Sequence, residues 1–286
     1  MISESELRRL AAGRGVDPLI LNLDYALGWF LAGLYRDRNL ARLLRFKGGT
    51  CLSKAYFPDY RFSEDLDFTA AQRIDGDEAE DVARQVAGWS EEKNGPDFRA
   101  APPLLETISD EYGGETFELR VYFRGPLAWA GSPQAIRMHV TRDERLVMPG
   151  EDRPLLHPYS DADRLGAPRL VCYSLVEMLA EKLRALSGQR RFAIARDVYD
   201  VHRLAAAGDN PALLADVLRQ KLEAKAMSPE SVAPAQLVAR RGEFERNWES
   251  QLAYLLPRGQ AVEFAVAWTT TTDLLKSVGD ALQGRS

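Results

Sequence analysis

Two carboxylates two positions apart are the residues in this sequence best placed to do chemistry. Asp65 and Asp67 lie in the run RFSEDLDF, in which apolar and polar residues alternate. Successive side chains of a β-strand point to opposite faces, so the run predicts a strand with Ser63, Asp65 and Asp67 on one face and apolar residues on the other. Two neighbouring carboxylates can hold Mg²⁺ against a nucleoside triphosphate, because Mg²⁺ prefers carboxylate and phosphate oxygens.

A glycine pair shortly before this run supplies a second part of such a site. Gly48 and Gly49 allow a tight turn in which the backbone approaches a ligand closely. We expect Thr50 to cap a helix that includes Lys54, and the first free N–H groups of that helix suit a phosphate. These four residues and Ser63 are the predicted nucleotide contacts. A glycine turn or an Asp-x-Asp strand alone is more often an ordinary loop or strand edge, but their combination in one short stretch favours a nucleotide site.

The two runs GGTCLSKAYF and RFSEDLDF together resemble the AbiEii/AbiGii family of nucleotidyltransferase-like toxins, which includes the mycobacterial MenT toxins. They are similar, more distantly, to the DNA polymerase β superfamily, which has a glycine turn followed by an Asp-x-Asp strand. The resemblance implies a Mg²⁺-dependent enzyme that uses Asp65 and Asp67 to transfer a nucleoside monophosphate from a nucleoside triphosphate to RNA. It further implies a toxin of a toxin–antitoxin or abortive-infection system. A transfer RNA 3′ end would be its acceptor, translation would be blocked, and a cognate antitoxin would be its partner.

A lysine within an apolar stripe marks a second candidate region. Lys182 recurs at helical spacing with leucines, and a core-facing lysine is costly unless its ammonium meets an anion, snorkels to solvent or pairs with a buried acid. Asp197 borders the stripe of the next helix, where pairs of Asp200 with Arg196 or Arg203 would be ordinary helix surface. However, the string EMLAEKLRALSGQRRFAIARDVYDVHRL resembles a second motif of the same family. This resemblance implies that Lys182 and Asp197 are catalytic.

One position departs from the superfamily pattern. A later strand there usually supplies a third metal-binding carboxylate, but the matching position in this sequence is His139. Three alternatives stay open. Asp143 or Glu144 supplies the group, His139 ligates or orients, or two carboxylates alone hold the metal.

The composition is that of an ordinary soluble globular protein. The 286 residues are 45% hydrophobic and 28% charged, which suffices for a sizeable core. The net charge of −5 gives no global basic field, so contact with nucleic acid would need a local patch. The candidates are two basic runs, formed by Arg36, Arg38, Arg42, Arg45 and Lys47 and by Arg184, Arg190, Arg191 and Arg196.

The cysteines and the apolar runs predict a cytoplasmic location. Cys51 and Cys172 form no spacing motif and lie in apolar helical patterns, so we expect reduced core residues. The start, MISESELRRL, is polar and unlike a signal peptide, and the longest apolar runs are too short to span a bilayer. We therefore expect no membrane partner.

The periodicity predicts an α/β (α+β) fold with two lobes. Helices over 3–13, from 18 onward and over 76–94, with strands at 116–124, at 135–142 and around the two aspartates, make a small mixed sheet of nucleotidyltransferase type. From 161 the pattern is helical to the end. We expect a nucleotidyltransferase-like domain over 1–160 and a helical domain over 161–286, facing it across a cleft. Asp24, on the apolar face of the second helix, is expected to pair with an arginine.

Two functions of other classes stay open from the sequence. One is a protein that binds a nucleotide without transferring it, which the missing third carboxylate supports. The other is a protein whose main role is to dock to an antitoxin. Transfer of radiolabel from a nucleoside triphosphate to RNA would separate the enzyme from both.

Overall fold

The chain folds into two compact units in the computed structural model. The structure describes residues 1–37, 43–72, 76–109, 115–127, 131–189 and 192–282. The first unit comprises Met1–Glu144, Gly150–Cys172 and Leu255–Gln260, and the second comprises Arg145–Pro149, Tyr173–Tyr254 and Ala261–Ser286. The predicted boundary after residue 160 precedes the last strand of the sheet, which belongs to the first unit.

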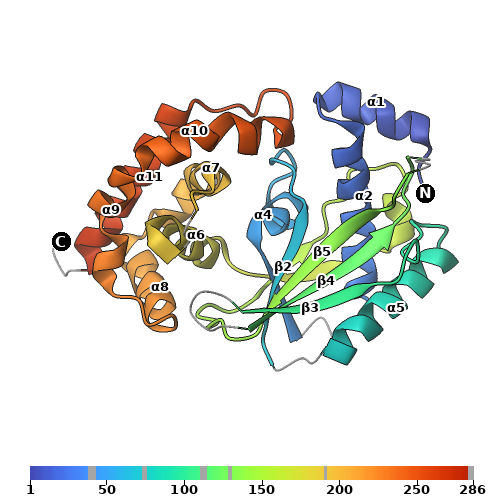
Figure 1. Cartoon of the computed structure of the whole chain (residues 1–286), viewed down its shortest axis with the longest axis horizontal. Helices are drawn as coiled ribbons and strands as arrows, with labels where there is room; N and C mark the ends of the chain where they lie inside the picture. Colours follow the sequence, from blue (N-terminus) through green and yellow to red (C-terminus); the bar gives the residue numbers. More distant parts are fainter. Residues whose placement is uncertain (38–42, 73–75, 110–114, 128–130, 190–191, 283–286) are drawn as a thin grey trace. The chain divides into compact units, whose positions relative to one another are not determined.

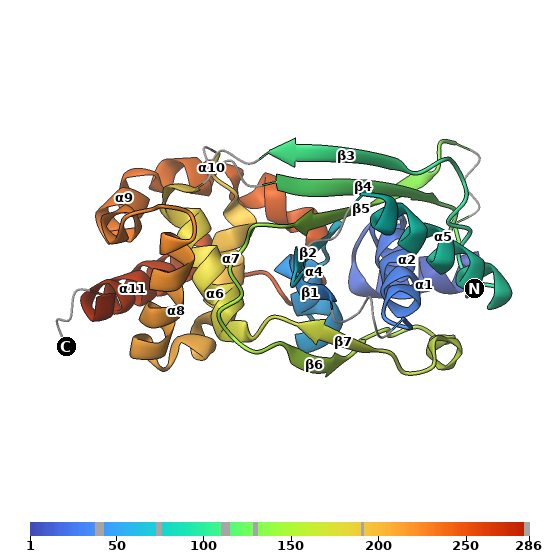
Figure 2. The same ribbon diagram turned by 90° about the horizontal axis from the view of Figure 1, so that it is seen from below.

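A mixed sheet of seven strands forms the centre of the first unit (Figures 1 and 2). Its spatial order is β3-β4-β5-β2-β1-β7-β6. The β1–β7 and β2–β5 pairs are parallel, and the others are antiparallel. The strands are β1 (Leu44–Lys47), β2 (Asp65–Ala70), β3 (Leu104–Ser109), β4 (Glu115–Phe123), β5 (Gln134–Thr141), β6 (Glu151–Pro154) and β7 (Arg169–Cys172).

This sheet confirms the predicted fold class but is larger than predicted. The predicted strands correspond to β2, β4 and β5, with their ends shifted by one residue or a few. The expectation of helices alone after residue 161 is wrong, because β7 pairs with both β1 and β6. Strands of four residues, such as β1, β6 and β7, are too short to show an alternating pattern.

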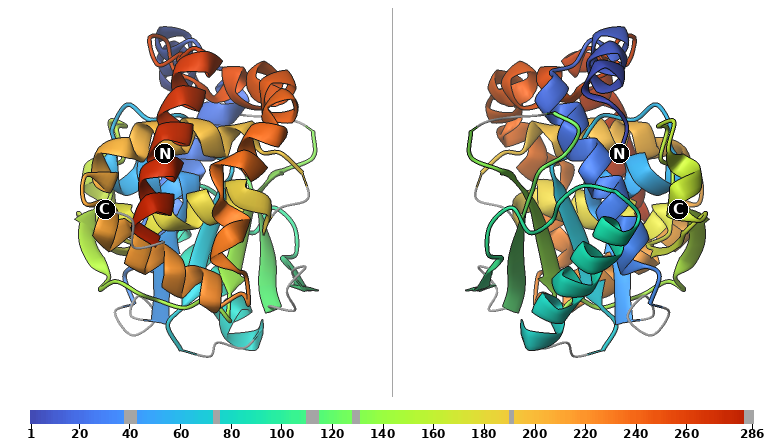
Figure 3. Two further views of the ribbon diagram at one scale, coloured as in Figure 1. Left: turned by 90° about the vertical axis from the view of Figure 1, so that its left-hand side faces the viewer. Right: turned by 90° about the vertical axis from the view of Figure 1, so that its right-hand side faces the viewer.

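Three helices of at least 11 residues accompany this sheet in the described part of the chain. They are α1 (Glu4–Arg14), α2 (Pro18–Leu34) and α5 (Gly76–Glu92), close to the predicted ranges. The Ser3 hydroxyl accepts a bond from the Glu6 N–H, which confirms the predicted cap of α1. Helices α2 and α5 pack against each other and against the sheet (Figure 3), with the indole rings of Trp29 and Trp89 centred 5.4 Å apart.

The second unit is helical in its described residues. Its main helices are α6 (Leu175–Arg184), α7 (Ala195–Leu204), α8 (Pro211–Glu223), α9 (Pro234–Ala239), α10 (Arg241–Leu252) and α11 (Phe264–Leu282). Its core is made of fully buried aliphatic side chains, among them Leu183, Val198, Leu218 and Val278. This packing positions α6 and α7 side by side and thereby fixes their charged residues.

Cys51 and Cys172 are free and buried, as predicted, but Cys172 lies on strand β7 and not in a helix. Across the described ranges, no helix has both the length and the apolar character that crossing a bilayer requires.

Candidate active site

The glycine turn connects β1 directly to a short helix, α4 (Gly48–Cys51). Gly48 adopts φ of 77°, a region that L side chains rarely occupy. A Cβ added at Gly48 would lie closer than 3.0 Å to the carboxylate of Asp67, and one added at Gly49 would lie equally close to the guanidinium of the buried Arg61. Gly48 is therefore strained by any L side chain, whereas a side chain at Gly49 would require the end of the Arg61 side chain to move.

Thr50 joins this turn to the acidic strand. Helix α4 already begins at Gly48, so the prediction that Thr50 caps the helix is wrong. The Thr50 hydroxyl instead donates to the backbone carbonyl of Asp65. The chain continues as a π-helical turn, η1 (Leu52–Tyr56), which ends at Phe57. The turn and the strand are thus tied together by a side-chain bond that sequence analysis did not predict.

Strand β2 has the predicted two faces. Leu66 and Phe68 are fully buried, whereas Asp65 and Asp67 are half-buried on the opposite face. Ser63 lies just before the strand and is also half-buried. Burial, and then the neighbouring charge of Asp67, raises the pKa of the Asp65 carboxyl. The two carboxylates therefore form a site where an added cation would relieve electrostatic repulsion.

The acidic face fits a divalent cation that a nucleotide would help to hold. Asp65 Oδ1 is buried and has no hydrogen-bond partner in the described part of the chain. Buried polar atoms normally have a partner, so this oxygen is suited to a ligand or ion. The described residues contain no group of three or more His, Cys, Asp or Glu side chains able to hold a metal ion. A Mg²⁺ ion at Asp65 and Asp67 would therefore need phosphate oxygens or water as its remaining ligands.

His139 lies beside Asp67 and is itself held by a glutamate. Its Nδ1 is 3.3 Å from Asp67 Oδ1 and its Nε2 is 3.1 Å from Glu118 Oε2. The bond to Asp67 is the main cause that raises the pKa of His139 to about 9, against the opposing effect of burial. Because both ring nitrogens make bonds to carboxylates, the geometry favours the orienting role among the alternatives left open above. Glu118 was missed because nothing in its own sequence neighbourhood distinguishes it from surface charge.

Asp143 and Glu144, the other candidates for a third carboxylate, follow the end of β5. Asp143 is exposed and Glu144 is buried. Neither is in the row of side chains that joins Asp67 to Glu118.

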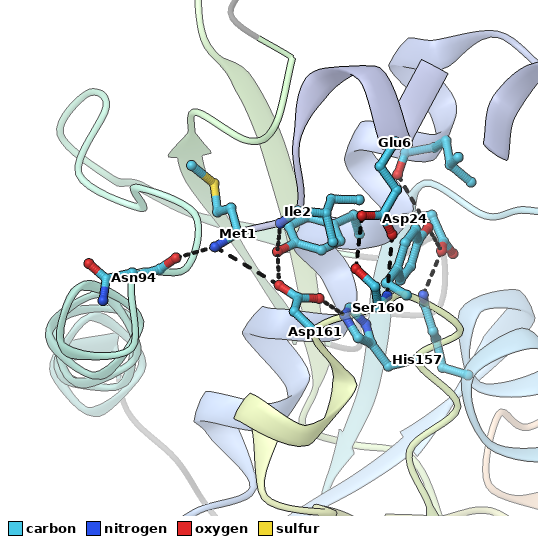
Figure 4. Close-up of polar contacts among 12 residues, drawn as sticks. Met1, Ile2, Glu6, Asp24, Asn94, His157, Ser160 and Asp161 are labelled. Atoms are coloured by element: carbon cyan, nitrogen blue, oxygen red, sulfur yellow. Dashed lines mark hydrogen bonds and ion pairs between the residues drawn. The ribbon is translucent and has the colours of Figure 1, made fainter. Parts of the chain in front are cut away.

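Lys54 lies in a buried ion pair. Its Nζ is 2.7 Å from Asp24 Oδ2, and both side chains are almost fully buried. Asp24 also accepts a hydrogen bond from the Tyr159 hydroxyl at 2.7 Å, beside a second polar cluster that contains Asp161 and His157 (Figure 4). The expected arginine partner of Asp24 is thus corrected to a lysine. The predicted contact of Lys54 with a nucleotide stays a prediction, and the ammonium would have to serve it from within this pair.

In the second unit, the two motif residues meet. Lys182 Nζ is 2.5 Å from Asp197 Oδ1 and 2.8 Å from Asp200 Oδ2. The Lys182 side chain is 15% exposed, and Asp200 is fully buried. This confirms that a lysine on an apolar stripe is matched by an acid. Asp200, which we expected on the helix surface, is a buried member of the cluster, and the spacing of the two aspartates on one helix was the signal for it.

The first glutamate of the same motif also has a partner. Glu177 accepts hydrogen bonds from the backbone N–H groups of Val147 and Met148, and Lys221 Nζ lies 2.8 Å from its Oε1. Lys221 and Glu177 are buried, so they form a fixed anchor for α6. The helix that carries Lys182 is therefore attached to both the 145–149 segment and α8.

The predicted basic runs are only partly described. Arg38, Arg42, Arg190 and Arg191 lie outside the described residues. Arg184 is buried and donates to the Lys221 carbonyl at 2.8 Å, so it is not part of a surface patch. The guanidinium of Arg36 lies 5.5 Å from the centre of the Trp89 ring.

Comparisons with known proteins identify the family of this chain and a similar fold. The model of the family described as "Nucleotidyl transferase AbiEii toxin, Type IV TA system" matches residues 29–269. A crystal structure of a candidate nucleotidyltransferase from H. pylori is similar in fold, with a TM-score of 0.54 and 15% sequence identity. The similarity covers 95% of this chain and 99% of that chain. The search of curated proteins found no match.

Proposed function

Because this chain belongs to the AbiEii family of nucleotidyltransferase toxins of type IV toxin–antitoxin systems, we propose that it is a Mg²⁺-dependent toxin that adds nucleotides to RNA. It transfers a nucleoside monophosphate from a nucleoside triphosphate to the 3′ end of an RNA, a transfer RNA, and thereby blocks translation. The toxin acts in the cytoplasm, where nucleoside triphosphates and transfer RNA are abundant. A cognate antitoxin is its regulatory partner.

The acidic face of β2 is the observation that carries this proposal. Asp65 and Asp67 share one face, Asp65 has a buried oxygen without a partner among the described residues, and the Gly48 backbone touches the Asp67 carboxylate. A strand with ordinary surface carboxylates would not need a glycine at φ 77° next to one of those carboxylates. A nucleoside triphosphate with its metal ion would satisfy the carboxylates and the adjoining turn together.

The reaction is a displacement at the α-phosphorus. A hydroxyl oxygen of the acceptor forms a bond to that phosphorus, the bond to the bridging α–β oxygen breaks, and pyrophosphate leaves. Bound Mg²⁺ would supply charge neutralisation at the phosphate oxygens. In this scheme Gly48, Gly49 and Ser63 contact the phosphates, while Asp65 and Asp67 fix the metal complex and so orient the triphosphate.

The second family motif contributes Lys182 and Asp197 as further catalytic residues in this scheme. Lys182 neutralises negative charge that develops on the phosphates. Asp197 accepts the proton of the attacking hydroxyl or positions it.

Incubation of the protein with total RNA, Mg²⁺ and each of the four α-labelled nucleoside triphosphates tests the proposal. We expect label in an RNA of transfer RNA size, at its 3′ end, and dependent on Mg²⁺. Asp67→Asn should abolish it while the circular dichroism spectrum is unchanged. A folded wild-type protein that binds a triphosphate but labels no RNA would replace the proposal with the function of a nucleotide-binding protein.

The choice of RNA as acceptor has a separate test. Binding through basic side chains releases counterions, so affinity for RNA should fall steeply as salt rises. Filter binding of total transfer RNA at several salt concentrations measures this slope. Binding that does not change with salt would contradict an electrostatic RNA contact.

A further inference from the structure

A row of polar side chains crosses three strands at the level of Asp67. In the parallel pair of β2 and β5, Asp67 lies opposite His139, and in the antiparallel pair of β5 and β4, His139 lies opposite Glu118. Residues directly opposite on neighbouring strands point to the same face of a sheet. The backbone register alone therefore brings these three side chains together.

The contacts within the row leave His139 little freedom. Its two ring nitrogens lie 3.3 Å from Asp67 Oδ1 and 3.1 Å from Glu118 Oε2. Glu118 is 8% exposed and is held in turn by the Arg120 guanidinium, whose Nε lies 2.5 Å from Glu118 Oε1. Arg120 also reaches Glu106 on the edge strand β3, at 3.3 Å. The row thus ends in an ion pair that anchors it to the rest of the sheet.

Bonds within the row keep the buried Glu118 in its charged form. Burial raises the pKa of Glu118, but the bonds from Arg120 and His139 outweigh it and lower the pKa overall. A half-buried histidine between two carboxylates is a specific arrangement, since replacing it by an apolar residue would leave two acids close together without the group that bridges them.

We propose that His139 and Glu118 are positioning residues for Asp67: Glu118 fixes the ring of His139, and His139 fixes the Asp67 carboxylate for metal-bound triphosphate. This inference rests on the proposed function, since it concerns the same acidic face. Asp65 and Asp67 are then the two metal-binding carboxylates, and His139 and Glu118 support Asp67 without binding the metal ion. Such outer partners commonly change metal affinity about 10–100-fold when removed, because a ligand that rotates freely binds less tightly.

Binding of Mn²⁺ provides a test that needs neither RNA nor turnover. Mn²⁺ is titrated with each α,β-methylene nucleoside triphosphate and followed by electron paramagnetic resonance. His139→Leu should weaken Mn²⁺ binding in the ternary complex about 10–100-fold. His139→Gln keeps an N–H donor for Asp67 and should recover most of the affinity. The Mn²⁺ affinity of Glu118→Ala should lie between the affinities of His139→Leu and His139→Gln, because the His139 ring keeps its contact with Asp67. Thr141→Val changes the next residue on the same face of β5 and serves as the matched control, with unchanged affinity.

The sign of the change separates positioning from simple electrostatics. A cationic His139 that acted only through its charge would repel the metal ion, so His139→Leu would then tighten Mn²⁺ binding. Tighter or unchanged binding in His139→Leu overturns the proposal, and so does a wild-type protein that binds no Mn²⁺ with any of the triphosphates. His139→Gln tests it independently if His139→Leu does not fold. Wild-type Mn²⁺ binding without RNA labelling would defeat the proposed reaction and leave the positioning role intact.

Discussion

Replacing Gly48 by alanine probes the close approach between the glycine turn and the acidic strand. At φ of 77°, an L side chain strains the backbone by about 1–2 kcal/mol. The new Cβ would also lie closer than 3.0 Å to the Asp67 carboxylate, so the carboxylate or the turn must move. The free energy of unfolding should therefore fall by more than the backbone strain alone, and Asp67 should lose its position.

Gly166 offers a matched control for this substitution. Its φ is 75°, and an added Cβ there meets no heavy atom of the described residues within 4 Å. Both glycines belong to the first unit, so unfolding of one unit reports on both. Gly166→Ala should lose about 1–2 kcal/mol and keep full Mn²⁺ binding and transfer activity. The difference between the two variants isolates the contact with Asp67.

Urea unfolding of the two variants, together with Mn²⁺ binding in the presence of triphosphate, measures both effects. We expect Gly48→Ala to be the less stable variant and to lose Mn²⁺ affinity about 10-fold or more, in the range seen when metal ligands lose their support. Equal losses of stability in Gly48→Ala and Gly166→Ala, with Mn²⁺ binding intact in both, would refute the reasoning.

Three further predictions concern buried charges. Lys182→Met leaves two buried aspartates without the ammonium between them, so urea unfolding should show a loss of about 3–5 kcal/mol, and transfer to RNA should disappear. Lys221→Met should lower the free energy of unfolding by a similar amount, about 3–5 kcal/mol, because Glu177 is left as a buried charge. A decrease smaller than that of a surface lysine variant would contradict this prediction. Burial lowers the pKa of His157 more than Asp161 raises it, so the unfolded chain binds the proton more tightly and stability should fall as pH drops below about 6.5, by at most about 1.4 kcal/mol per pH unit. The free energy of unfolding should decrease less between about pH 7.5 and about pH 5.5 for His157→Gln than for wild type.

The acidic face was predictable because alternation in a strand is a local property. Apolar residues at Leu66 and Phe68 fix which way Asp65 and Asp67 point, whatever the strand pairs with. The same holds in part for Lys182, since a lysine on an apolar stripe predicts either a paired acid or an ammonium that reaches solvent. Identity, spacing and the cost of burial sufficed at these positions.

The sheet was less predictable because its outer strands depend on partners. Strand β1 reads as part of a basic run, and its residues Arg45 and Lys47 are half-buried beside Phe46. Its strand conformation follows from pairing with β2 on one side and β7 on the other. A segment of four residues contains too few side chains for its period to be recognised.

Lys54 has a structural role in addition to its predicted contact with a nucleotide. A lysine a few residues after a glycine turn is placed like a phosphate-binding lysine, and that is why it was predicted as a nucleotide contact. In the structure its ammonium neutralises Asp24 on α2, and burial lowers its pKa. This ion pair joins η1 to α2 and thereby stabilises the glycine turn, which lies just before η1 in the chain. The lysine supports the site even before any contact with a nucleotide is considered.

Glu118 marks the limit of reasoning from one stretch of sequence at a time. On β4 its neighbours are ordinary strand residues, and it gains meaning through two successive registers, from β4 to β5 and from β5 to β2. A shift of either register by one residue would turn the side chain to the other face and remove it from Asp67's row. The apolar alternation that fixes those registers therefore also assembles the row. The core residues Leu119 and Met138, which face each other across β4 and β5, contribute to the chemistry of a site that they do not touch.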